Sequence, residues 1–214
     1  MKDTETNAGL FDSLMFDMDG TLWDAVDSYC AIWNACIDEC CPDVKKVDRA
    51  TLSAMMGKPL DFIYNTLIGN AAPVDKFMER LDANEAILMP KLGGRLYPGV
   101  TETISELSKR YRLFMVSNCT HRGLPVFLEF TGLKPYFTDA VSFGETGHEK
   151  DVNIAMLMER YGLKAPLYIG DTQGDCRSSH AAGVPFAWAK YGFGKDVNDA
   201  EYTLNSITDL TKIC

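Results

Sequence analysis

The chain has 214 residues and a formal net charge of −9, with 46% hydrophobic and 24% charged residues. This composition is typical of a globular protein that buries a substantial core. The acidic balance argues against binding to nucleic acid or to an anionic membrane. Seven cysteines without paired C-x-x-C spacing favour reduced thiols, and therefore a cytoplasmic protein.

The first predicted strand is the apolar run 14–16, which leads into the segment 17–21, Asp-Met-Asp-Gly-Thr. Its two carboxylates, Asp17 and Asp19, repel each other by roughly 4 kcal/mol if they lie ~4 Å apart at an effective dielectric near 20. Either one of them keeps its proton or a cation lies between them, and both arrangements are typical of active sites. An ordinary surface turn is the alternative, because Asp and Gly are common turn residues.

Helical patterns follow one another from about residue 24 to residue 92. Apolar residues at three- and four-residue spacing predict helices over 24–40, after Asp48, from Pro59 onward and over 73–91. We expect these helices to form a compact unit inserted after the first strand. Five large side chains of the insert are expected in its core rather than in a pocket: Trp33, Met55, Met56, Tyr64 and Met78.

Strand and helix patterns alternate from residue 93 to the end of the chain. Apolar runs predict strands at 113–116, 140–143, 166–169, 184–188 and 202–204, with helical patterns between them. Such alternation implies right-handed crossovers and an α/β fold with a doubly wound parallel sheet. The predicted domains are an α/β core formed by residues 1–22 and 93–214, and a helical insert formed by residues 23–92.

Unusual polar residues follow the predicted strands at their carboxyl ends. Asp17, Ser117 and Asp171 each end or follow a strand, Lys150 opens a helix, and Asp175 lies at the start of the next one. In open parallel sheets, ligands bind outside these strand ends. Carboxylate ligation with open positions suits Mg²⁺, which keeps waters and is shared with a substrate phosphate.

The segments 17–21, Ser117-Asn118, Lys150 and 170–175 occur in the order of the four motifs of the haloacid dehalogenase-like hydrolase superfamily. The chain resembles this superfamily over essentially its whole length. The helical insert looks like the cap of phosphoglycolate phosphatase-like and beta-phosphoglucomutase-like members. The resemblance therefore implies a Rossmann-like core with an inserted α-helical cap.

The resemblance also implies catalytic roles. Asp17 attacks phosphorus and becomes an aspartyl-phosphate, and Asp19 acts first as a general acid and then as a general base. Lys150 stabilises the charge on the transferring phosphoryl group. Ser117 and Asn118 hold phosphoryl and substrate oxygens.

A magnesium site follows from the same resemblance. The Asp17 carboxylate, the Asp19 carbonyl and Asp171 are expected to hold Mg²⁺. Asp175 is expected at the same metal site, either as a direct ligand or acting through water or by orienting Lys150. Many relatives carry proline directly after this lysine, whereas this chain has Asp151-Val152-Asn153. Because of that departure, Lys134 and Lys164 remain alternative candidates for the catalytic lysine.

The reaction class is narrowed by two residues of the first motif. Asp19 argues against a dehalogenase or a phosphonate-cleaving enzyme. The resemblance implies that these relatives have no acidic residue at that position. Thr21 favours phosphatases over mutases and is expected near the substrate. Lys58, in the break before Pro59, is expected either to contact a substrate anion or to be a solvated loop lysine. His121 follows a strand end and is a further candidate for substrate contact.

The sequence thus predicts a Mg²⁺-dependent phosphomonoester phosphatase that acts on a small phosphorylated metabolite through an aspartyl-phosphate. The alternatives are a phosphosugar mutase of the same superfamily and a catalytically silent binding protein on the same fold. The substrate depends on which cap side chains meet the site. No prediction of the oligomeric state follows from the pattern.

Overall fold

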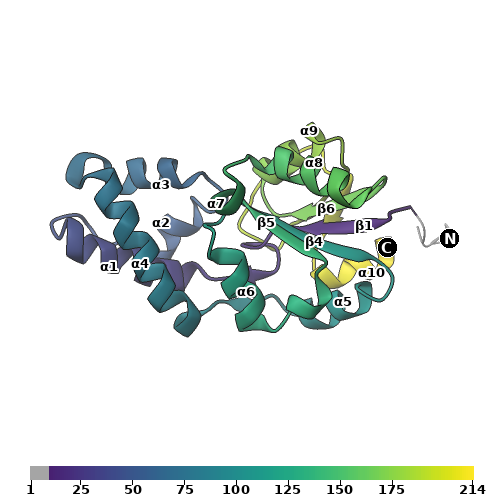
Figure 1. Ribbon diagram of the computed structural model, residues 1–214, viewed down its shortest axis with the longest axis horizontal. Helices are drawn as coiled ribbons and strands as arrows, with labels where there is room; N and C mark the ends of the chain where they lie inside the picture. The colour runs from purple at the N-terminus through teal and green to yellow at the C-terminus, as the bar shows by residue number, and fades with distance from the viewer. Residues whose placement is uncertain (1–9) are drawn as a thin grey trace.

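The computed structural model describes residues 10–214, so the first nine residues of the predicted core segment 1–22 lie outside it. An open sheet with helices on both faces forms one end of the molecule, and four helices gather at the other end (Figure 1). The N-terminal and C-terminal ends of the described chain lie at the sheet end (Figure 1). The arrangement confirms the predicted α/β fold with a helical insert.

The sheet has six strands, all parallel, in the order β5-β4-β1-β6-β7-β8. The first strand, β1, is buried at every position because helices cover both faces of a parallel sheet. The six strands are β1 (Ser13–Phe16), β4 (Arg112–Ser117), β5 (Asp139–Ser142), β6 (Pro166–Gly170), β7 (Phe186–Ala189) and β8 (Tyr202–Leu204).

Helices cover both faces of this sheet, as the predicted right-handed crossovers require. One face is covered by α8 (Lys150–Tyr161) and α9 (Gln173–Ala181), and the other by α5 (Val100–Leu107), α6 (Gly123–Thr131) and α10 (Leu210–Ile213) (Figure 1). Two separate hydrophobic clusters result, one on each face. Short 3₁₀ turns at η2 (Lys134–Tyr136) and η3 (Ile207–Asp209) complete the connections.

The insert consists of α1 (Val26–Cys40), α2 (Arg49–Ser53), α3 (Leu60–Leu67) and α4 (Val74–Leu92), with a 3₁₀ turn η1 (Gly69–Ala71) before α4. The Asp48 side chain accepts a hydrogen bond from the Thr51 amide and caps α2, as predicted. Phe77 packs against Trp33 and Tyr64 with ring centroids 5.4 and 5.5 Å apart. The four helices of the insert therefore pack together, and we call this unit the cap.

A two-stranded antiparallel ribbon joins the cap to the sheet domain, and the sequence patterns did not predict it. Its strands are β2 (Trp23–Asp24) and β3 (Arg95–Leu96). Trp23 is buried and packs edge-on against Phe127, with the ring centroids 5.0 Å apart. The ribbon lies where the predicted domain boundaries fall, at residues 22–23 and 92–93. The division into two domains remains a prediction.

One predicted strand is too long. Residues 140–143 were expected to be extended, but Phe143 begins the short helix α7 (Phe143–Thr146). The Ser142 side chain accepts a hydrogen bond from the Glu145 amide at 3.3 Å and turns the chain into this helix. Among residues 10–214, no helix is long and apolar enough to cross a membrane.

Candidate active site

The three central strands of the sheet bring the predicted polar residues together. In the order β4-β1-β6, the carboxyl ends of the strands lie side by side. Asp17 follows β1, Ser117 ends β4, and Asp171 follows β6. All three side chains are buried. The sheet order therefore converts three distant sequence positions into one site.

Lys150 is the first residue of α8 and reaches into this site. Its ammonium group donates a hydrogen bond to Asp17 Oδ1 at 2.9 Å and another to Asp175 Oδ1. The Lys150 side chain is only 5% exposed. Burial would lower the pKa of Lys150, but Asp17 and Asp175 hold this pKa well above its ordinary value. The ammonium therefore stays charged between the two carboxylates.

The rival lysines of the sequence assignment lie elsewhere. Lys134 belongs to the 3₁₀ turn η2, and Lys164 lies in the loop before β6, where its amide donates to Asp12. Neither side chain lines the cavity described below. The geometry therefore favours Lys150 in spite of the missing proline after it.

Asp175 combines a local and a long-range role. Its Oδ2 accepts hydrogen bonds from the Thr172 amide at 2.9 Å and the Thr172 hydroxyl at 2.6 Å, while its own amide donates to that hydroxyl. This reciprocal capping box begins α9. Its Oδ1 is left to pair with Lys150. The helix cap thus fixes the carboxylate that orients the lysine.

Asp171 is held by the loop that follows β7. The Phe193 and Gly194 amides donate to Asp171 Oδ2 at 2.7 and 3.1 Å. A Cβ at Gly192 would overlap the Gly20 carbonyl and the Asp171 side chain, so the loop can approach only as glycine. Gly192 and Gly194, in the loop after β7, were the sequence feature that could have indicated this contact.

Asp171 Oδ1 is buried and has no hydrogen-bond partner among the described residues. Carboxylate oxygens of Asp17, Asp171 and Asp175 all lie within 4.8 Å of one another. Burial, together with the charges of Asp175 and Asp17, raises the pKa of Asp171 well above its ordinary value. A buried acceptor without a donor, beside two further carboxylates, is the donor set that a hard divalent cation requires.

Asp19 lies outside this cluster and is positioned by the ribbon and the cap. Trp23 Nε1 donates to its Oδ1 at 2.9 Å, and the Tyr29 hydroxyl donates to its Oδ2 at 3.2 Å. Burial and the charge of Asp17 raise the pKa of Asp19 to about 8. The pKa of Asp17 rises only to about 6, because Lys150 opposes the effect of burial. The surroundings therefore favour the protonated form more strongly at Asp19 than at Asp17.

The site opens into a cavity of about 600 Å³ between the cap and the sheet domain. Asp17, Asp19, Ser117, Asn118 and Lys150 line its inner end. Asn118 Oδ1 is buried without a hydrogen-bond partner among the described residues, as expected of a group that awaits a substrate atom. The structure therefore brings most of the predicted site residues to one cavity.

Two further residues, Lys58 and Thr21, were expected near the substrate, and the structure places them differently from each other. Lys58 lines the cavity, but it is exposed and its ammonium group lies 6.0 Å from the centre of the Phe62 ring. Thr21 does not line the cavity; its side chain is fully buried, and its hydroxyl has no hydrogen-bond partner among the described residues. The Thr21 carbonyl accepts a hydrogen bond from the Tyr191 hydroxyl at 2.9 Å. The expected place of Thr21 near the substrate stays a prediction.

Other residues of the cavity wall were missed or misplaced by the sequence patterns. Trp33, Met56 and Met78 were expected in the cap core but also line the cavity. Glu85, on α4, and Thr120, after Asn118, line it too and were not singled out. Their positions depend on how the cap meets the sheet domain, and no local pattern encodes that contact.

The family comparison agrees with this geometry. The haloacid dehalogenase-like hydrolase family matches residues 14–189, from the first strand of the sheet to the end of β7. The chain belongs to this family. The resemblance read from the four motifs is confirmed, and so is the prediction that the protein is a hydrolase.

Several named proteins are similar over most of the chain. Pyrophosphatase PpaX of Bacillus velezensis is 26% identical over 211 residues, which cover 94% of this chain and 95% of the relative. A phosphoglycolate phosphatase of Pseudomonas syringae pv. syringae is 28% identical over 230 residues, covering 94% of this chain and 77% of the relative. The crystal structure of a predicted phosphoglycolate phosphatase from Haemophilus somnus 129pt superposes with a TM-score of 0.84 at 20% identity, covering 95% of this chain and 97% of that one. That superposition confirms the fold.

Proposed function

We propose that the protein is a Mg²⁺-dependent phosphomonoester phosphatase that acts on a small phosphorylated metabolite. The observation that carries the proposal is the buried ion pair between Lys150 and Asp17, which lines the cavity. The carboxylates of Asp171 and Asp175 lie beside Asp17. An ionised aspartate next to a permanent cation is suited to attack phosphorus. The similarity to proteins named phosphoglycolate phosphatase and pyrophosphatase supports phosphoryl transfer as the chemistry.

Four acidic residues would take part in holding the metal. Asp17 and Asp171 would ligate it through carboxylates, Asp19 through its backbone carbonyl, and Asp175 from beside the site. When bound, Mg²⁺ would supply positive charge to the phosphoryl oxygens and would satisfy the unpartnered Asp171 Oδ1. The Asp19 carboxylate would remain free for proton transfer, since Trp23 and Tyr29 hold it away from the cluster.

The protein groups then perform two displacements at phosphorus. Asp17 Oδ forms a bond to phosphorus as the bond to the ester oxygen breaks, and Asp19 donates its proton to the leaving alkoxide. Asp19, now ionised, takes a proton from water as that water attacks the aspartyl-phosphate and releases phosphate. Lys150, Ser117 and Asn118 would hold the phosphoryl oxygens in both steps.

The raised pKa of Asp19 suits this order of events. A carboxylic acid with a pKa of about 8 carries the proton that the first displacement consumes. The cap would exclude bulk water while phosphorus is transferred. All seven cysteines are free thiols, which supports a cytoplasmic location.

Release of inorganic phosphate tests the proposal. The purified protein with Mg²⁺ is expected to liberate phosphate from an aryl phosphate and from several phosphorylated metabolites. Any turnover of a bisphosphorylated hexose is expected to release phosphate rather than to return an isomer. Isomerisation without net phosphate release would instead establish a mutase, and an absence of both reactions would contradict the proposal.

Metal binding is expected to raise the melting temperature of the protein. Mg²⁺ at a hundredfold excess over its Kd stabilises a one-site protein by about 2.7 kcal/mol. In a domain of this size, that corresponds to a shift of roughly 5–10 °C in differential scanning fluorimetry. Asp171→Asn should lose most of the shift, because it removes a charged ligand.

The exposed Asp43 provides the matched control for this experiment. Asp43→Asn makes the same chemical change on the cap surface and should keep the full shift. An Asp171→Asn variant that responds to Mg²⁺ as strongly as the original protein would remove Asp171 from the metal site.

A further inference from the structure

Three acidic side chains of the cap, Asp61, Asp82 and Glu85, line the active-site cavity, and Glu85 is the buried one among them. Glu85 lies on α4, lines the cavity and is only 5% exposed. Its Oε1 accepts a hydrogen bond from the Thr120 hydroxyl at 2.8 Å. Thr120 follows the Ser117-Asn118 segment, so this contact ties the cap directly to the phosphate-binding end of the site.

Glu85 differs from its neighbour Asp82, which lies almost one turn earlier on the same helix. Asp82 accepts hydrogen bonds from the Arg122 guanidinium at 3.0 and 3.3 Å, and His121 lies 3.8 Å away. Within residues 10–214, no lysine, arginine or histidine forms an ion pair with Glu85. The Asp82 charge is therefore compensated, whereas that of Glu85 has only a neutral hydroxyl as partner.

Glu85 faces the same cavity as the reacting groups. Asp19 and Tyr29 line this cavity too, and Thr120, the hydrogen-bond partner of Glu85, lies two residues after Asn118. Asp19 is the group that would protonate the ester oxygen, and Glu85 lines the same cavity, so a leaving group that extends toward the cap passes Glu85. Burial raises the pKa of Glu85 itself. A second anion brought to this point would meet a negative charge or would require uptake of a proton, and either effect weakens its binding at neutral pH.

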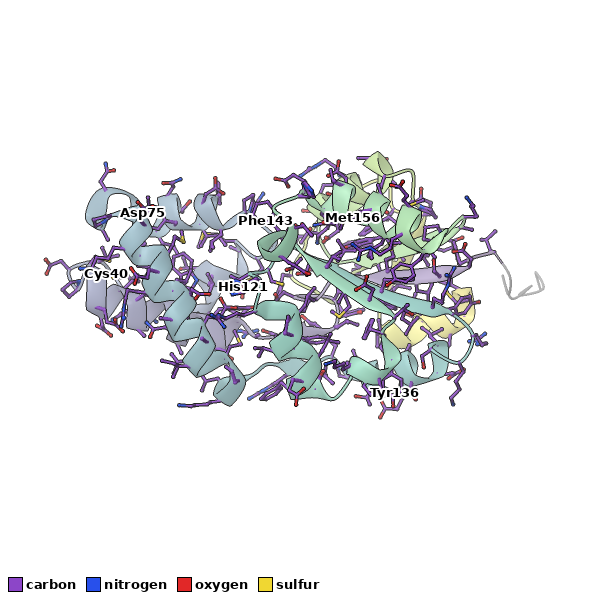
Figure 2. The ribbon with its side chains drawn as sticks, in the orientation of Figure 1. Cys40, Asp75, His121, Tyr136, Phe143 and Met156 are labelled. Carbon is purple, nitrogen blue, oxygen red and sulfur yellow. The ribbon has the colours of Figure 1, made fainter. Side chains whose placement is uncertain are left out.

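Apolar side chains dominate the cap side of the cavity. They come from α1, α2 and α4 and from the loop before α3: Ile32, Trp33, Leu52, Met56, Met78 and Leu81. Phe143, on α7, is 42% exposed and lines the cavity from the sheet domain. Figure 2 shows Phe143 and His121 at the junction of the cap and the sheet domain. A leaving group that extends from the phosphate into the cap therefore contacts hydrocarbon and aromatic surface.

The cations that line the cavity form no ion pair with Glu85 in the part of the chain that the structure describes. Lys150 is paired with Asp17 and Asp175, and His121 lies beside Asp82. Lys58 is exposed, so bulk solvent screens its attraction for an anion. His121 and Arg122 oppose the effect of burial on the pKa of Glu85, but neither forms an ion pair with it.

We propose that this protein acts on phosphate monoesters of alcohols with an apolar, uncharged body, and that Glu85 rejects leaving groups that carry a second anion beside the ester. This inference rests on the proposed phosphatase function and specifies its substrate class. The apolar wall binds the body of the substrate, and Glu85 discriminates against carboxylates. Phosphoglycolate is then a poor substrate, although similar proteins are named for it.

Three esters of graded chemistry test the substrate class. With Mg²⁺ present, kcat/KM is measured for phosphoglycolate, for 2-hydroxyethyl phosphate and for 2-phenylethyl phosphate. The neutral hydroxyethyl ester should exceed phosphoglycolate by about tenfold or more, since unit charges a few ångströms apart repel strongly in a partly buried site. The phenylethyl ester should exceed both, because its ring is buried against the cap. A preference for phosphoglycolate over its neutral analogue would overturn the inference.

Glu85→Gln identifies the discriminating residue. Glutamine keeps an acceptor for the Thr120 hydroxyl but removes the charge, so the ratio of neutral ester to phosphoglycolate should fall by about tenfold. Glu79→Gln makes the same change at an exposed position of α4 and should leave the ratio unchanged. An unchanged ratio in Glu85→Gln would overturn the role of Glu85.

The substrate series also separates the two proposals. If none of the three esters releases phosphate, the phosphatase function itself fails, and the substrate class fails with it. If all three release phosphate and phosphoglycolate is preferred, only the substrate class fails. The comparison of the three esters uses the unmodified protein, so it does not depend on the folding of any variant.

Discussion

Replacing Asp17 by asparagine is expected to lower kcat/KM for any substrate by about 10⁴-fold or more, as removal of a covalent nucleophile does in other hydrolases. An amide oxygen is a far weaker nucleophile than a carboxylate and cannot form the same acyl phosphate. Asp17 Oδ1 is the atom that Lys150 contacts at 2.9 Å, so the change also removes the charge that the ammonium group faces. Phosphate release at saturating Mg²⁺ measures the effect.

The variant should nevertheless fold, because Lys150 keeps Asp175 as a partner and asparagine has nearly the shape of aspartate. Its melting temperature is therefore measured beside its activity. Asp75→Asn, at an exposed position of the cap that Figure 2 labels, is the matched control and should retain full turnover. A folded Asp17→Asn protein that keeps even one-hundredth of the original rate would exclude Asp17 as the nucleophile.

The sequence predicted the strand-end residues well, and the reason is topological. Apolar runs locate the buried strands, and in a parallel sheet their carboxyl ends all face the same way. Once 14–16, 113–116 and 166–169 are recognised as strands, the residues that follow them must lie at one edge. The positions of Asp17, Ser117 and Asp171 could therefore be predicted without knowledge of side-chain geometry.

The residues that hold these groups in place could not be predicted in the same way. The Asp171 carboxylate depends on amides of Phe193 and Gly194, and Asp19 depends on Trp23 and Tyr29. These are contacts between a strand end and a loop, a ribbon or a cap helix, and none leaves a periodic pattern in the sequence. Phe143 was misassigned because a single serine cap, a local effect, ended the strand early.

The cap shows the same limit most clearly. Periodicity located its four helices, but it could not distinguish an apolar side chain in a closed core from one at a cavity wall. Trp33, Met56 and Met78 serve in both places. Relatives at 26–28% identity carry names for two different substrates, so similarity does not choose between them. The choice lies in the cap side chains that reach the cavity, Glu85 among them.

Replacing Lys150 by methionine is expected to have the second large effect, on stability as well as on activity. The substitution leaves Asp17, Asp171 and Asp175 clustered in the interior with no cation between them. Breaking a buried ion pair from one side costs about 3–5 kcal/mol. For a domain of this size, that lowers the melting temperature by roughly 10 °C. The pKa of Asp17 should rise further, since Lys150 is the group that lowers it.

Activity should fall by about 10²–10³-fold, because a charged donor aimed at the transferring phosphoryl group is lost and Asp17 becomes harder to ionise. Lys164→Met provides the control, since that lysine was the rival assignment and lies away from the cavity. It should change neither the melting temperature nor the rate appreciably.

Magnesium separates the two roles of Lys150. If the lysine neutralises the acidic cluster, Mg²⁺ should restore most of the lost melting temperature of Lys150→Met, because the cation replaces the missing positive charge among the carboxylates. The rate should stay low even then, because no ammonium group remains to bind the phosphoryl oxygens. Full recovery of turnover by Mg²⁺ would reduce Lys150 to a structural residue, whereas a Lys150→Met protein as stable and active as Lys164→Met would remove it from the site.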